Sequence, residues 1–312
     1  MKNLKKIKGD ASYREFFRKK NKNFHSVIVY SKKEKFKNLL VYDAINKILN
    51  KNRILAPKLY QEDYKKNYIE IQDFGNDTIY KILKKKKNKG FFYFKKIIKI
   101  LDKIQTIKNR KIKNFKKNTY VIPEYKKEIL LQEANLFIDW YVKKNKKKFR
   151  EKFKKITNTL VSHLKLRNNV FVHRDFHVSN LMLHHDKLGV IDSQDALIGN
   201  KAYDLASLID DVRLKTSISF KNQVYKMYIN KQKILNKDKF KNDFEILSIL
   251  RNLKIIGIFT RLSKRDGKKK YLKLIPYAWK LINLRINNNE IFIDLKDLLK
   301  KNFRGKINEN WY

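Results

Sequence analysis

The sequence predicts an α+β protein with a short strand-rich segment near its start and a mainly helical remainder. Apolar runs of strand length fall at Val27–Tyr30 and Tyr68–Gln72. From Phe91 onward, apolar residues recur mostly every three or four positions, as they do on the buried face of a helix. A chain of 312 residues with 42% hydrophobic content can bury a sizeable core, and its length suits two lobes or two domains.

A turn of small residues precedes the first apolar run. Lys8–Arg18 reads KGDASYREFFR, in which Gly9, Asp10, Ala11 and Ser12 form the turn. Small residues between two strands let backbone N–H groups approach phosphate oxygens, and Ser12 adds a hydroxyl donor. The same four residues would also suit a plain hairpin turn that binds no phosphate. The turn therefore indicates a phosphate-covering loop only in combination with the catalytic motif described below.

A helix is expected over Phe36–Asn50, where apolar residues recur near helical spacing. After the apolar run Tyr68–Gln72 comes the triplet Asp73–Gly75, which resembles the metal-binding triplet of protein kinases. It lies about 100 residues before the catalytic motif instead of after it. We interpret it as a hinge between lobes, where backbone groups around Asp73 would meet the adenine of a nucleotide. Thr78 is expected to start the next helix.

The remaining helices follow from the same apolar periodicity. They are expected over Phe91–Ile107, Tyr125–Val142, Phe149–Leu164, Tyr203–Leu214, Phe240–Ser263, Tyr271–Leu284 and Ile291–Lys300.

The strongest chemical signal is the stretch Val172–Asp195, which reads VHRDFHVSNLMLHHDKLGVIDSQD. It contains H-R-D-x-x-x-x-N, and Asp192 closes a short apolar run twelve residues after Asn180. This pattern is typical of enzymes that move a phosphoryl group from ATP to a hydroxyl. Such chemistry needs one carboxylate beside the acceptor oxygen, the role predicted for Asp175, and separate oxygen ligands for Mg²⁺. An ordinary buried hairpin with polar loop residues is the alternative interpretation.

The spacing of this stretch predicts how its side chains meet. Leu181–Leu183 and Leu188–Ile191 are expected to be two short strands joined by the turn His184–Lys187, which would return Asp192 to the side of Asn180 as a second metal ligand.

Roles in this arrangement are also expected for the neighbouring polar residues. His173 and Arg174 are expected to hold the loop in shape. His177 is placed to contact the acceptor or phosphate, or else to pack. Gln194 and Asp195 follow the metal ligand and would face the acceptor, unless they form a solvated turn.

The formal net charge of +46 is the most unusual feature of the composition. Such an excess favours anionic partners. The lysines are nevertheless spread along the whole chain among many Asn and Ile residues, so we expect solvated helix faces and no specific nucleic-acid site. Cysteine is absent, no apolar run approaches a membrane span, and the N-terminus lacks the apolar core of a signal peptide. A cytoplasmic protein without a membrane partner is expected.

Several segments together resemble a known family. VHRDFHVSNLM, GVIDSQDALIG and AYDLASLIDD resemble the aminoglycoside-phosphotransferase-like small-molecule kinases. GDASYREFFR, IEIQDFGNDTIY, LLQEANLFIDWYV and RNLKIIGIFTRLSKRDGKKKYL resemble the anomeric N-acetylmuramate/N-acetylglucosamine kinases of cell-wall recycling. These segments span nearly the whole chain in the same order.

The resemblance implies a bilobal protein-kinase-like fold. A small β-rich lobe over residues 1–74 would bind the nucleotide phosphates, and a helical lobe over residues 75–312 would carry the catalytic loop and the acceptor site. It also implies ATP and Mg²⁺, with Asp175 as base and with Asn180 and Asp192 holding the metal. The strand expected to carry an ATP-binding Lys has none pointing inward. Arg14 or Arg18 would supply the positive charge, with Lys32 as the alternative.

A sugar acceptor makes further residues candidates for binding. Glu133 and Asp139 interrupt an otherwise apolar helix, where carboxylates are costly to bury unless they are paired. They are candidates to hydrogen-bond the sugar hydroxyls, with Trp140 stacking on the ring. Arg261 and Arg265 could pair with an acidic group of the substrate, although a solvated basic face is the simpler interpretation.

The expected function is thus ATP-dependent phosphorylation of a small-molecule sugar by a monomer. Two alternatives stay open. The acceptor could be another small hydroxylated compound, such as an aminoglycoside, choline or a homoserine-like molecule. Alternatively, the chain could be a basic scaffold for nucleic acid, whose binding would weaken steeply with salt and would not depend on Asp175.

Overall fold

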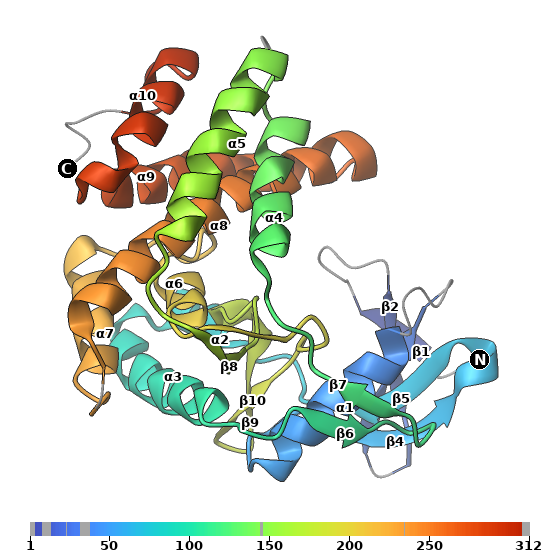
Figure 1. The fold of residues 1–312 in the computed structure, drawn as a ribbon. Helices are drawn as coiled ribbons and strands as arrows, with labels where there is room; N and C mark the ends of the chain where they lie inside the picture. Colours follow the sequence, from blue (N-terminus) through green and yellow to red (C-terminus); the bar gives the residue numbers. More distant parts are fainter. Residues whose placement is uncertain are drawn as a thin grey trace. The chain divides into compact units, whose positions relative to one another are not determined.

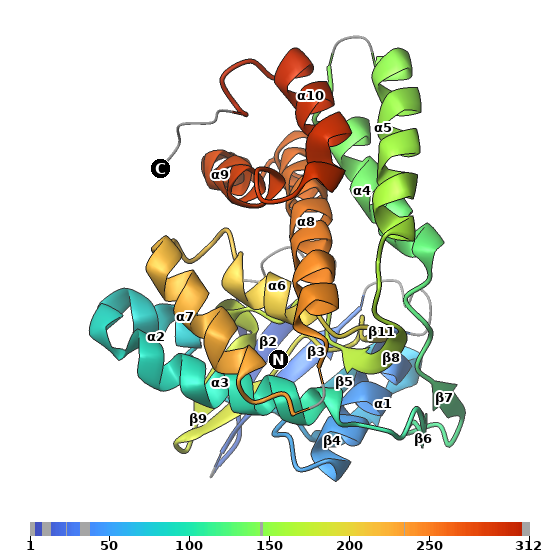
Figure 2. The ribbon, with the colours of Figure 1, turned by 60° about the vertical axis from the view of Figure 1, so that its left-hand side comes forward.

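The computed structural model describes residues 4–7, 14–22, 24–31, 38–143, 146–233 and 235–307 (Figures 1 and 2). The chain divides into two compact units, Met1–Pro123 with Val170–Ile198 (unit 1) and Glu124–Asn169 with Gly199–Tyr312 (unit 2). The lobe boundary expected at residue 74 divides the chain by the expected functions of its segments, whereas the two units are defined by packing. The units therefore do not test this boundary, which stays a prediction.

A five-stranded antiparallel sheet forms the first part of unit 1, in the order β1-β2-β3-β5-β4. Its strands are β1 (Leu4–Ile7), β2 (Glu15–Lys20), β3 (His25–Tyr30), β4 (Leu59–Asp63) and β5 (Tyr68–Gln72). Both predicted apolar runs, in β3 and β5, are therefore strands, and they lie side by side at the centre of the sheet.

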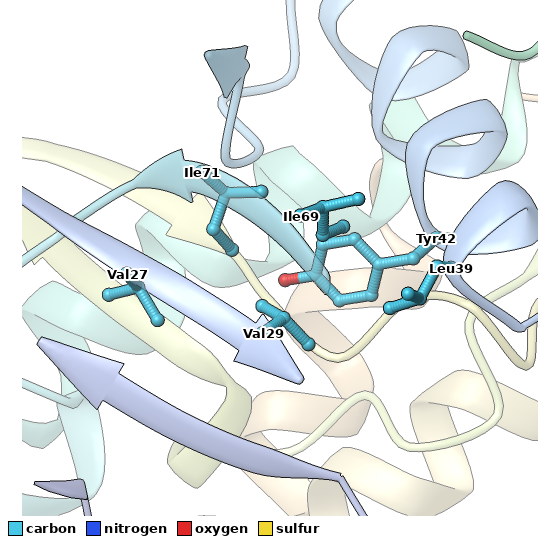
Figure 3. Close-up of a cluster of buried hydrophobic side chains, with 6 residues drawn as sticks. All are labelled: Val27, Val29, Leu39, Tyr42, Ile69 and Ile71. Atoms are coloured by element: carbon cyan, nitrogen blue, oxygen red, sulfur yellow. The ribbon is translucent and has the colours of Figure 1, made fainter. Parts of the chain in front are cut away.

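One face of this sheet is buried by helix α1 (Asn38–Lys51) (Figure 3). Alternate residues of a strand point to the same face, and the register pairs Val29 with Ile69 and Val27 with Ile71. Leu39 and Tyr42 of α1 complete this hydrophobic cluster, which contains only buried side chains. The helix predicted over Phe36–Asn50 is confirmed from Asn38 onward.

The rest of unit 1 includes two helices and two hairpins. They are α2 (Ile79–Lys85), α3 (Gly90–Gln105), β6 (Lys111–Lys113) paired with β7 (Thr119–Val121), and β9 (Leu181–His184) paired with β10 (Lys187–Val190). Helix α2 starts as predicted, because the Thr78 hydroxyl accepts a hydrogen bond from the backbone N–H of Lys81 at 3.2 Å. The β6–β7 hairpin was not expected from the sequence, since each strand has only three residues.

Unit 2 is helical over most of its described length. Its helices are α4 (Lys127–Trp140), α5 (Lys146–Ser162), α6 (Tyr203–Ile209), α7 (Ile218–Ile229), α8 (Lys237–Asp266), α9 (Ile275–Ile286) and α10 (Ile293–Asn302). The 30-residue helix α8 packs against both α4 and α9. Helix α8 approaches α4 closely at Gly257, where an added Cβ would lie 2.3 Å from the backbone of Leu136.

Two helix predictions for unit 2 were wrong in detail, and one helix was missed. The helix expected over Tyr203–Leu214 ends at Ile209. The helix expected over Tyr271–Leu284 begins as an α-helix only at Ile275, because Pro276 lacks an N–H and is tolerated only in a first turn; a 3₁₀ helix precedes it. Helix α7 was missed, although the Ser217 hydroxyl caps it by accepting from Phe220 N–H at 3.1 Å.

The predicted fold class is confirmed: a small antiparallel sheet near the N-terminus is followed by a largely helical remainder. Among the residues that the structure describes, no helix is both long enough and apolar enough to cross a membrane.

Candidate active site in unit 1

The H-R-D stretch lies between two strands of the chain. Strand β8 (Asn168–Val172) ends directly before His173, and the 3₁₀ helix Val178–Asn180 leads into β9. The hairpin β9–β10 turns at His185 and Asp186, whose φ angles of 46° and 57° suit a tight two-residue turn. The predicted hairpin is therefore confirmed, with a shorter turn than expected.

Asn180 connects the two ends of this stretch. Its Nδ2 donates to the carbonyl of Asp175 at 3.0 Å, and its own carbonyl accepts from the N–H of Ile191 at 3.0 Å. Asp175 is half-buried. The hairpin thus brings the residue before Asp192 back to Asn180, and the Oδ1 atom of Asn180 is the oxygen that remains available for a ligand.

His173 and Arg174 make contacts that hold the loop. The ring Nε2 of fully buried His173 donates to the Ile191 carbonyl at 3.1 Å, since a carbonyl can only accept. Arg174 has a φ of 72° and donates from Nη1 to the Asp195 carbonyl at 3.1 Å. Both bonds join the H-R-D residues to the segment that follows β10. His177 is also buried, and its N–H donates to the Asp175 carbonyl at 3.0 Å.

Asp192 is partly accessible, with 42% of its side chain exposed. Its φ of 60° is unusual for an aspartate. One carboxylate oxygen accepts from Arg14 Nη2 at 2.9 Å and from Gln194 Nε2 at 3.2 Å. Neither Arg14 nor Gln194 donates a hydrogen bond to the second carboxylate oxygen of Asp192. Asp192 therefore keeps one carboxylate oxygen for a cation or ligand.

Arg14 is held in a buried aromatic setting. Its side chain is 5% exposed, and its guanidinium carbon lies 5.7 Å from the Phe16 ring centre and 5.6 Å from that of Tyr42. Burial raises the pKa of Tyr42 to about 12, with Arg14 lowering and Asp192 raising it. The Tyr42 hydroxyl therefore remains protonated at neutral pH, and Arg14 is the cation that approaches Asp192.

Gln194 and Asp195 form a polar pair beside Asp192. Gln194 is 5% exposed and donates from Nε2 to a carboxylate oxygen of Asp195 at 2.8 Å, whereas its Oε1 is buried without a hydrogen-bond partner in the described part of the chain. Asp195 is exposed. Burial, followed by the charge of Asp195, raises the pKa of Tyr120 in β7 to about 12. Tyr120 is thus a neighbour of this pair that the sequence did not suggest.

The triplet Asp73–Gly75 forms a turn that is built around Arg18. Asp73 accepts from the Gly75 N–H at 2.8 Å and from Arg18 Nη2 at 2.9 Å, and Gly75 has a φ of 83°. Arg18 also donates to Asn76 Oδ1 at 2.8 Å. The guanidinium of Arg18 is therefore engaged with this turn, whereas Arg14 is the arginine beside Asp192.

The hairpin β9–β10 packs directly on the same segment. Leu183 N–H donates to the Asp77 carbonyl at 2.8 Å, and Phe74 is buried with its ring 4.8 Å from that of His184. A Cβ added at Gly189 would lie 2.6 Å from the Phe74 ring, so this approach requires glycine. The turn that we interpret as a hinge thus lies against the hairpin that connects Asn180 to Asp192.

Some predicted residues cannot be placed. Gly9, Asp10, Ala11, Ser12 and Lys32 lie outside the described residues.

The predicted metal ligands fit Mg²⁺ in chemistry and number. No group of three or more His, Cys, Asp or Glu side chains that could hold a metal occurs within the described ranges. Mg²⁺ usually takes one or two protein oxygen ligands and completes its shell with waters and substrate phosphates. The amide oxygen of Asn180 and the free carboxylate oxygen of Asp192 are such ligands.

The candidate acceptor residues of unit 2 separate into two groups. Glu133 accepts from Lys254 Nζ of α8 at 2.9 Å and from the Tyr125 hydroxyl. Asp139 is exposed and accepts from Arg150 Nη2 of α5 at 2.6 Å. Half-buried Trp140 lies seven residues after Glu133 and shares its side of α4, whereas Asp139 faces α5.

Comparison with known proteins identifies the family. Residues 3–234 match the family described as "Phosphotransferase enzyme family". The chain belongs to this phosphotransferase family. It is 30% identical over 278 residues to an N-acetylmuramate/N-acetylglucosamine kinase of Neisseria meningitidis, a match that covers 86% of this chain and 80% of that protein. The family resemblance drawn from the sequence is thereby confirmed, and the chain is a small-molecule kinase.

Solved structures show the same fold at low sequence identity. An amicoumacin kinase in complex with AMP-PNP and Ca²⁺ has a TM-score of 0.66 at 11% identity, over 91% of this phosphotransferase and 89% of that chain. The choline kinase LicA of Streptococcus pneumoniae has a TM-score of 0.62 at 15% identity, over 89% and 92%. These similarities establish a kinase fold but do not identify the acceptor.

Sequence reasoning missed several partners of the site residues. Lys254 and Tyr125 bind Glu133, and Arg150 binds Asp139. In a chain with 76 Lys and Arg residues, no local pattern distinguishes the few basic side chains that pair with a site residue from those on a solvated face.

Proposed function

We propose that this phosphotransferase transfers the γ-phosphoryl group of ATP to the anomeric hydroxyl of N-acetylmuramate or N-acetylglucosamine. The similarity to the Neisseria kinase carries the acceptor class, because it extends over 86% of the chain. The arrangement of Asp175, Asn180 and Asp192 supports the chemistry, because hydrogen bonds join Asn180 to Asp175 and to Ile191, the residue before Asp192, on either side of one local hairpin.

Asp175 is the proposed base. Its carboxylate would orient the acceptor hydroxyl and receive its proton as the oxygen forms a bond to the γ-phosphorus. The bond between the γ-phosphorus and the β–γ bridging oxygen breaks, and ADP leaves with that oxygen. The hydrogen bonds that His173, Arg174 and Asn180 make in the loop would hold Asp175 in place for this step.

Asn180 and Asp192 are the proposed holders of Mg²⁺, through the amide Oδ1 and the carboxylate. A bound Mg²⁺ would neutralise charge on the nucleotide phosphates. Arg14 is the proposed replacement for the ATP-binding lysine, since it is buried, is ion-paired with Asp192 at 2.9 Å and precedes β2 directly. The turn around Asp73 is proposed to meet the adenine.

The anomeric hydroxyl suits an aspartate base. An aspartate carboxylate is a weak base at neutral pH, so it orients a hydroxyl better than it deprotonates one early. The anomeric hydroxyl is the most acidic on a sugar, because the ring oxygen withdraws electron density. The loose transition state of phosphoryl transfer also demands little nucleophilic push. Gln194, Asp195 and His177 are proposed to contact the sugar.

The test is a panel of acceptors with the purified protein and magnesium-ATP. ADP release is measured with N-acetylmuramate, N-acetylglucosamine, choline, homoserine and an aminoglycoside, and products are examined by phosphorus NMR. We expect turnover with the amino sugars and a product whose phosphorus couples to the anomeric proton and is released by mild acid. An acid-stable 6-phosphate would refute the anomeric assignment. Turnover confined to choline or an aminoglycoside would refute the sugar acceptor.

A further inference from the structure

A basic segment without acidic residues runs through helices α2 and α3 of unit 1. Between Thr78 and Leu101 the sequence contains no aspartate or glutamate. Its charged side chains are those of nine lysines: Lys81, Lys84, Lys85, Lys86, Lys87, Lys89, Lys95, Lys96 and Lys99. None of these lysines forms an ion pair with a residue that the structure describes. The positive charge of this segment is therefore not balanced locally.

Two exposed phenylalanines lie in the middle of this segment. A 3₁₀ helix, Lys87–Lys89, leads from α2 directly into α3, which begins at Gly90 (Figure 2). Phe91 and Phe92 follow, with exposed fractions of 42% and 55%. Within the described ranges, no other two consecutive residues are both large, hydrophobic and exposed. Residues 84–89 are all exposed as well, so the phenyl rings and a cluster of ammonium groups lie next to one another on the surface.

The inner side of α3 fixes this surface in place. Its buried residues recur every three or four positions and include Tyr93, Phe94, Ile97, Ile98 and Leu101, and the helix contacts strand β10. Residues 91, 95 and 99 recur every four positions on the outer side, as do residues 92 and 96. The outward-facing groups therefore belong to a packed helix. We call residues 84–89, 91, 92, 95, 96 and 99 the α2–α3 basic surface.

An anionic lipid bilayer matches the chemistry of the α2–α3 basic surface. Lysine ammonium groups are attracted to lipid phosphates, and clusters of four to eight of them beside a helix suit an anionic membrane. Phenyl rings that are exposed on such a helix can enter the boundary between headgroups and acyl chains. An exposed apolar patch on an otherwise polar surface is typical of an interaction site. Binding of this kind is peripheral and requires no membrane-spanning helix.

Nucleic acid is the other polyanion that a basic and aromatic surface could bind. Stacking of a base requires an open ring face. The Lys96 ammonium lies 4.5 Å from the centre of the Phe92 ring, and Tyr93 meets the same ring edge-on at 5.1 Å. Arginine, the preferred cation for recognition of nucleic acids, is absent between residues 78 and 101. These contacts and this composition favour the bilayer.

We propose that the α2–α3 basic surface binds reversibly to anionic lipid bilayers, with Phe91 and Phe92 inserted among the headgroups. This proposal departs from the expectation that the protein has no membrane partner. It does not depend on which acceptor the kinase phosphorylates.

The first test is co-sedimentation of the full chain with lipid vesicles. Wild type should bind vesicles that mix phosphatidylglycerol with phosphatidylcholine and should not bind vesicles of phosphatidylcholine alone. Raising the salt concentration from about 50 to 300 mM should weaken this binding roughly tenfold or more, because the attraction acts within a Debye length of the surface. Equal binding to both kinds of vesicle, or binding to neither, would overturn the proposal.

A second test removes the rings. Phe91→Ser/Phe92→Ser should reduce binding to the mixed vesicles roughly 10- to 100-fold, because two partly exposed phenyl rings no longer leave water. Phe24→Ser/Tyr60→Ser is the matched control, since it removes another exposed aromatic pair whose ring centres are 5.7 Å apart.

The control pair lies in a different electrostatic setting. Strand β4 carries Glu62 and Asp63 as well as Tyr60, so its surface is not purely basic. Binding of the control should change less than about threefold. Equal losses in both double variants would show that the protein adsorbs through any exposed ring, which would refute the assignment to the α2–α3 basic surface.

A third test removes charge. In one variant, glutamine replaces Lys84, Lys85, Lys87 and Lys89. Binding should fall roughly 100-fold or more, because each lysine near an anionic bilayer contributes about fivefold. In the control, glutamine replaces four exposed lysines of α5, which also carries Glu151: Lys147, Lys148, Lys152 and Lys155. Both variants lose the same net charge, so equal losses of binding would assign the effect to the whole protein and refute the local surface.

A short single-stranded oligonucleotide tests the other partner. If wild type binds the oligonucleotide but not the mixed vesicles, and Phe91→Ser/Phe92→Ser loses this binding, the surface is a nucleic-acid site and the proposal fails. Thermal unfolding and ADP release with soluble substrates should stay near wild type in every variant, because none of these residues belongs to the proposed active site. Vesicle binding by a protein that phosphorylates no amino sugar would refute the proposed function alone.

Discussion

Hydrogen bonds between neighbouring residues of its loop position Asp175. The half-buried carboxylate follows a fully buried histidine and an arginine with positive φ, and Asn180 binds the Asp175 carbonyl. A substitution that keeps the size of Asp175 should therefore leave the loop intact.

Asp175→Asn is expected to lower turnover by roughly 10²- to 10⁴-fold, because the amide can neither take the proton nor align the hydroxyl by charge. Nucleotide affinity should hardly change. Coupled-assay rates and ATP titration measure the two quantities. Asp186→Asn, in the exposed hairpin turn where asparagine tolerates positive φ, is the control. Unchanged ADP production in Asp175→Asn would mean that Asp175 is not the base.

Asp192→Ala is expected to abolish activity and to weaken magnesium-dependent ATP binding, because a carboxylate contributes charge as well as an oxygen ligand. It also frees the buried Arg14 from its 2.9 Å ion pair. Asn180→Ala loses a neutral ligand, so excess Mg²⁺ should partly restore its activity. Titrating activity and ATP binding with Mg²⁺ distinguishes the loss of a charged ligand in Asp192→Ala from the loss of a neutral ligand in Asn180→Ala. Identical metal dependence in wild type and Asp192→Ala would exclude Asp192 as a ligand.

Asp210 is a buried acid in unit 2 whose role is structural. Arg285 donates to it at 2.9 and 3.1 Å, Ser248 donates at 2.6 Å, and Lys221 Nζ lies 3.4 Å away. Burial raises the pKa of Asp210, but the Arg285 and Lys221 charges outweigh it and lower the pKa to about 2. Because the folded pKa lies below the unfolded one, this stabilisation is complete above about pH 4 and is lost as pH falls toward 2.

Asp210→Asn is expected to reduce the free energy of unfolding at pH 7 by about 3–5 kcal/mol, since it leaves Arg285 and Lys221 buried without their counter-ion. Urea denaturation at several pH values measures this. The difference between wild type and variant should shrink as pH falls below about 4, where Asp210 begins to protonate in the unfolded chain, and should be lost by about pH 2, where it protonates in the folded protein. A difference that stays constant down to pH 2 would contradict the lowered pKa.

At the scale of elements, the crossing of α4 and α8 depends on one missing side chain. Gly257 is buried, and an added Cβ would meet the Leu136 carbonyl group at 2.3 Å and the Phe137 nitrogen at 2.6 Å. Because the obstructing atoms are backbone, the helices themselves must separate to accommodate it. The same contact sets the level at which Lys254 meets Glu133.

Gly257→Ala is expected to destabilise the protein by about 1–3 kcal/mol through this clash, although alanine by itself favours a helix by about 0.5–1 kcal/mol. Thermal unfolding measures whether Gly257→Ala lowers or raises the melting temperature. Lys241→Ala, on an exposed position of the same helix, should be neutral or slightly stabilising. If Gly257→Ala raises the melting temperature, the two helices have room to separate at little cost.

At the scale of the whole molecule, the net charge of +46 creates a long-range field that attracts anions. The proposed substrates, ATP and an amino sugar that can carry a carboxylate, include anions, so this field would aid their encounter with the protein without choosing between them. Selectivity has to come from individual contacts.

Raising the salt concentration from about 20 to 300 mM is expected to lower kcat/KM for magnesium-ATP by roughly threefold to tenfold, because exposed charges are screened over about a Debye length. The rate at saturating substrate should hardly change, since the reacting groups are partly buried. Initial rates across a salt series distinguish these effects. A kcat that falls in parallel with kcat/KM would show that the charge acts on the chemical step or on stability.

The sequence by itself determined the features whose partners are close along the chain. Asp175, Asn180 and Asp192 lie within 18 residues, and a single hairpin closed by a two-residue turn brings their segments together. Apolar periodicity likewise located most helices, because a helix buries one face whatever it packs against. Strand β6 and helix α7 were not predicted. A three-residue strand is too short to show a period, and the face of α7 is only weakly apolar.

Only the tertiary structure decided which distant side chains meet. Arg14 pairs with Asp192 across 178 positions, and the sequence could not choose between Arg14 and Arg18. Arg261 and Arg265 are four residues apart on one helix and look alike in sequence. Arg265 nevertheless pairs with Asp266, whereas the Nε atom of Arg261 is buried without a hydrogen-bond partner among the described residues. Pairing over such separations depends on how helices and sheet pack, and packing is a property of the whole unit that no local spacing encodes.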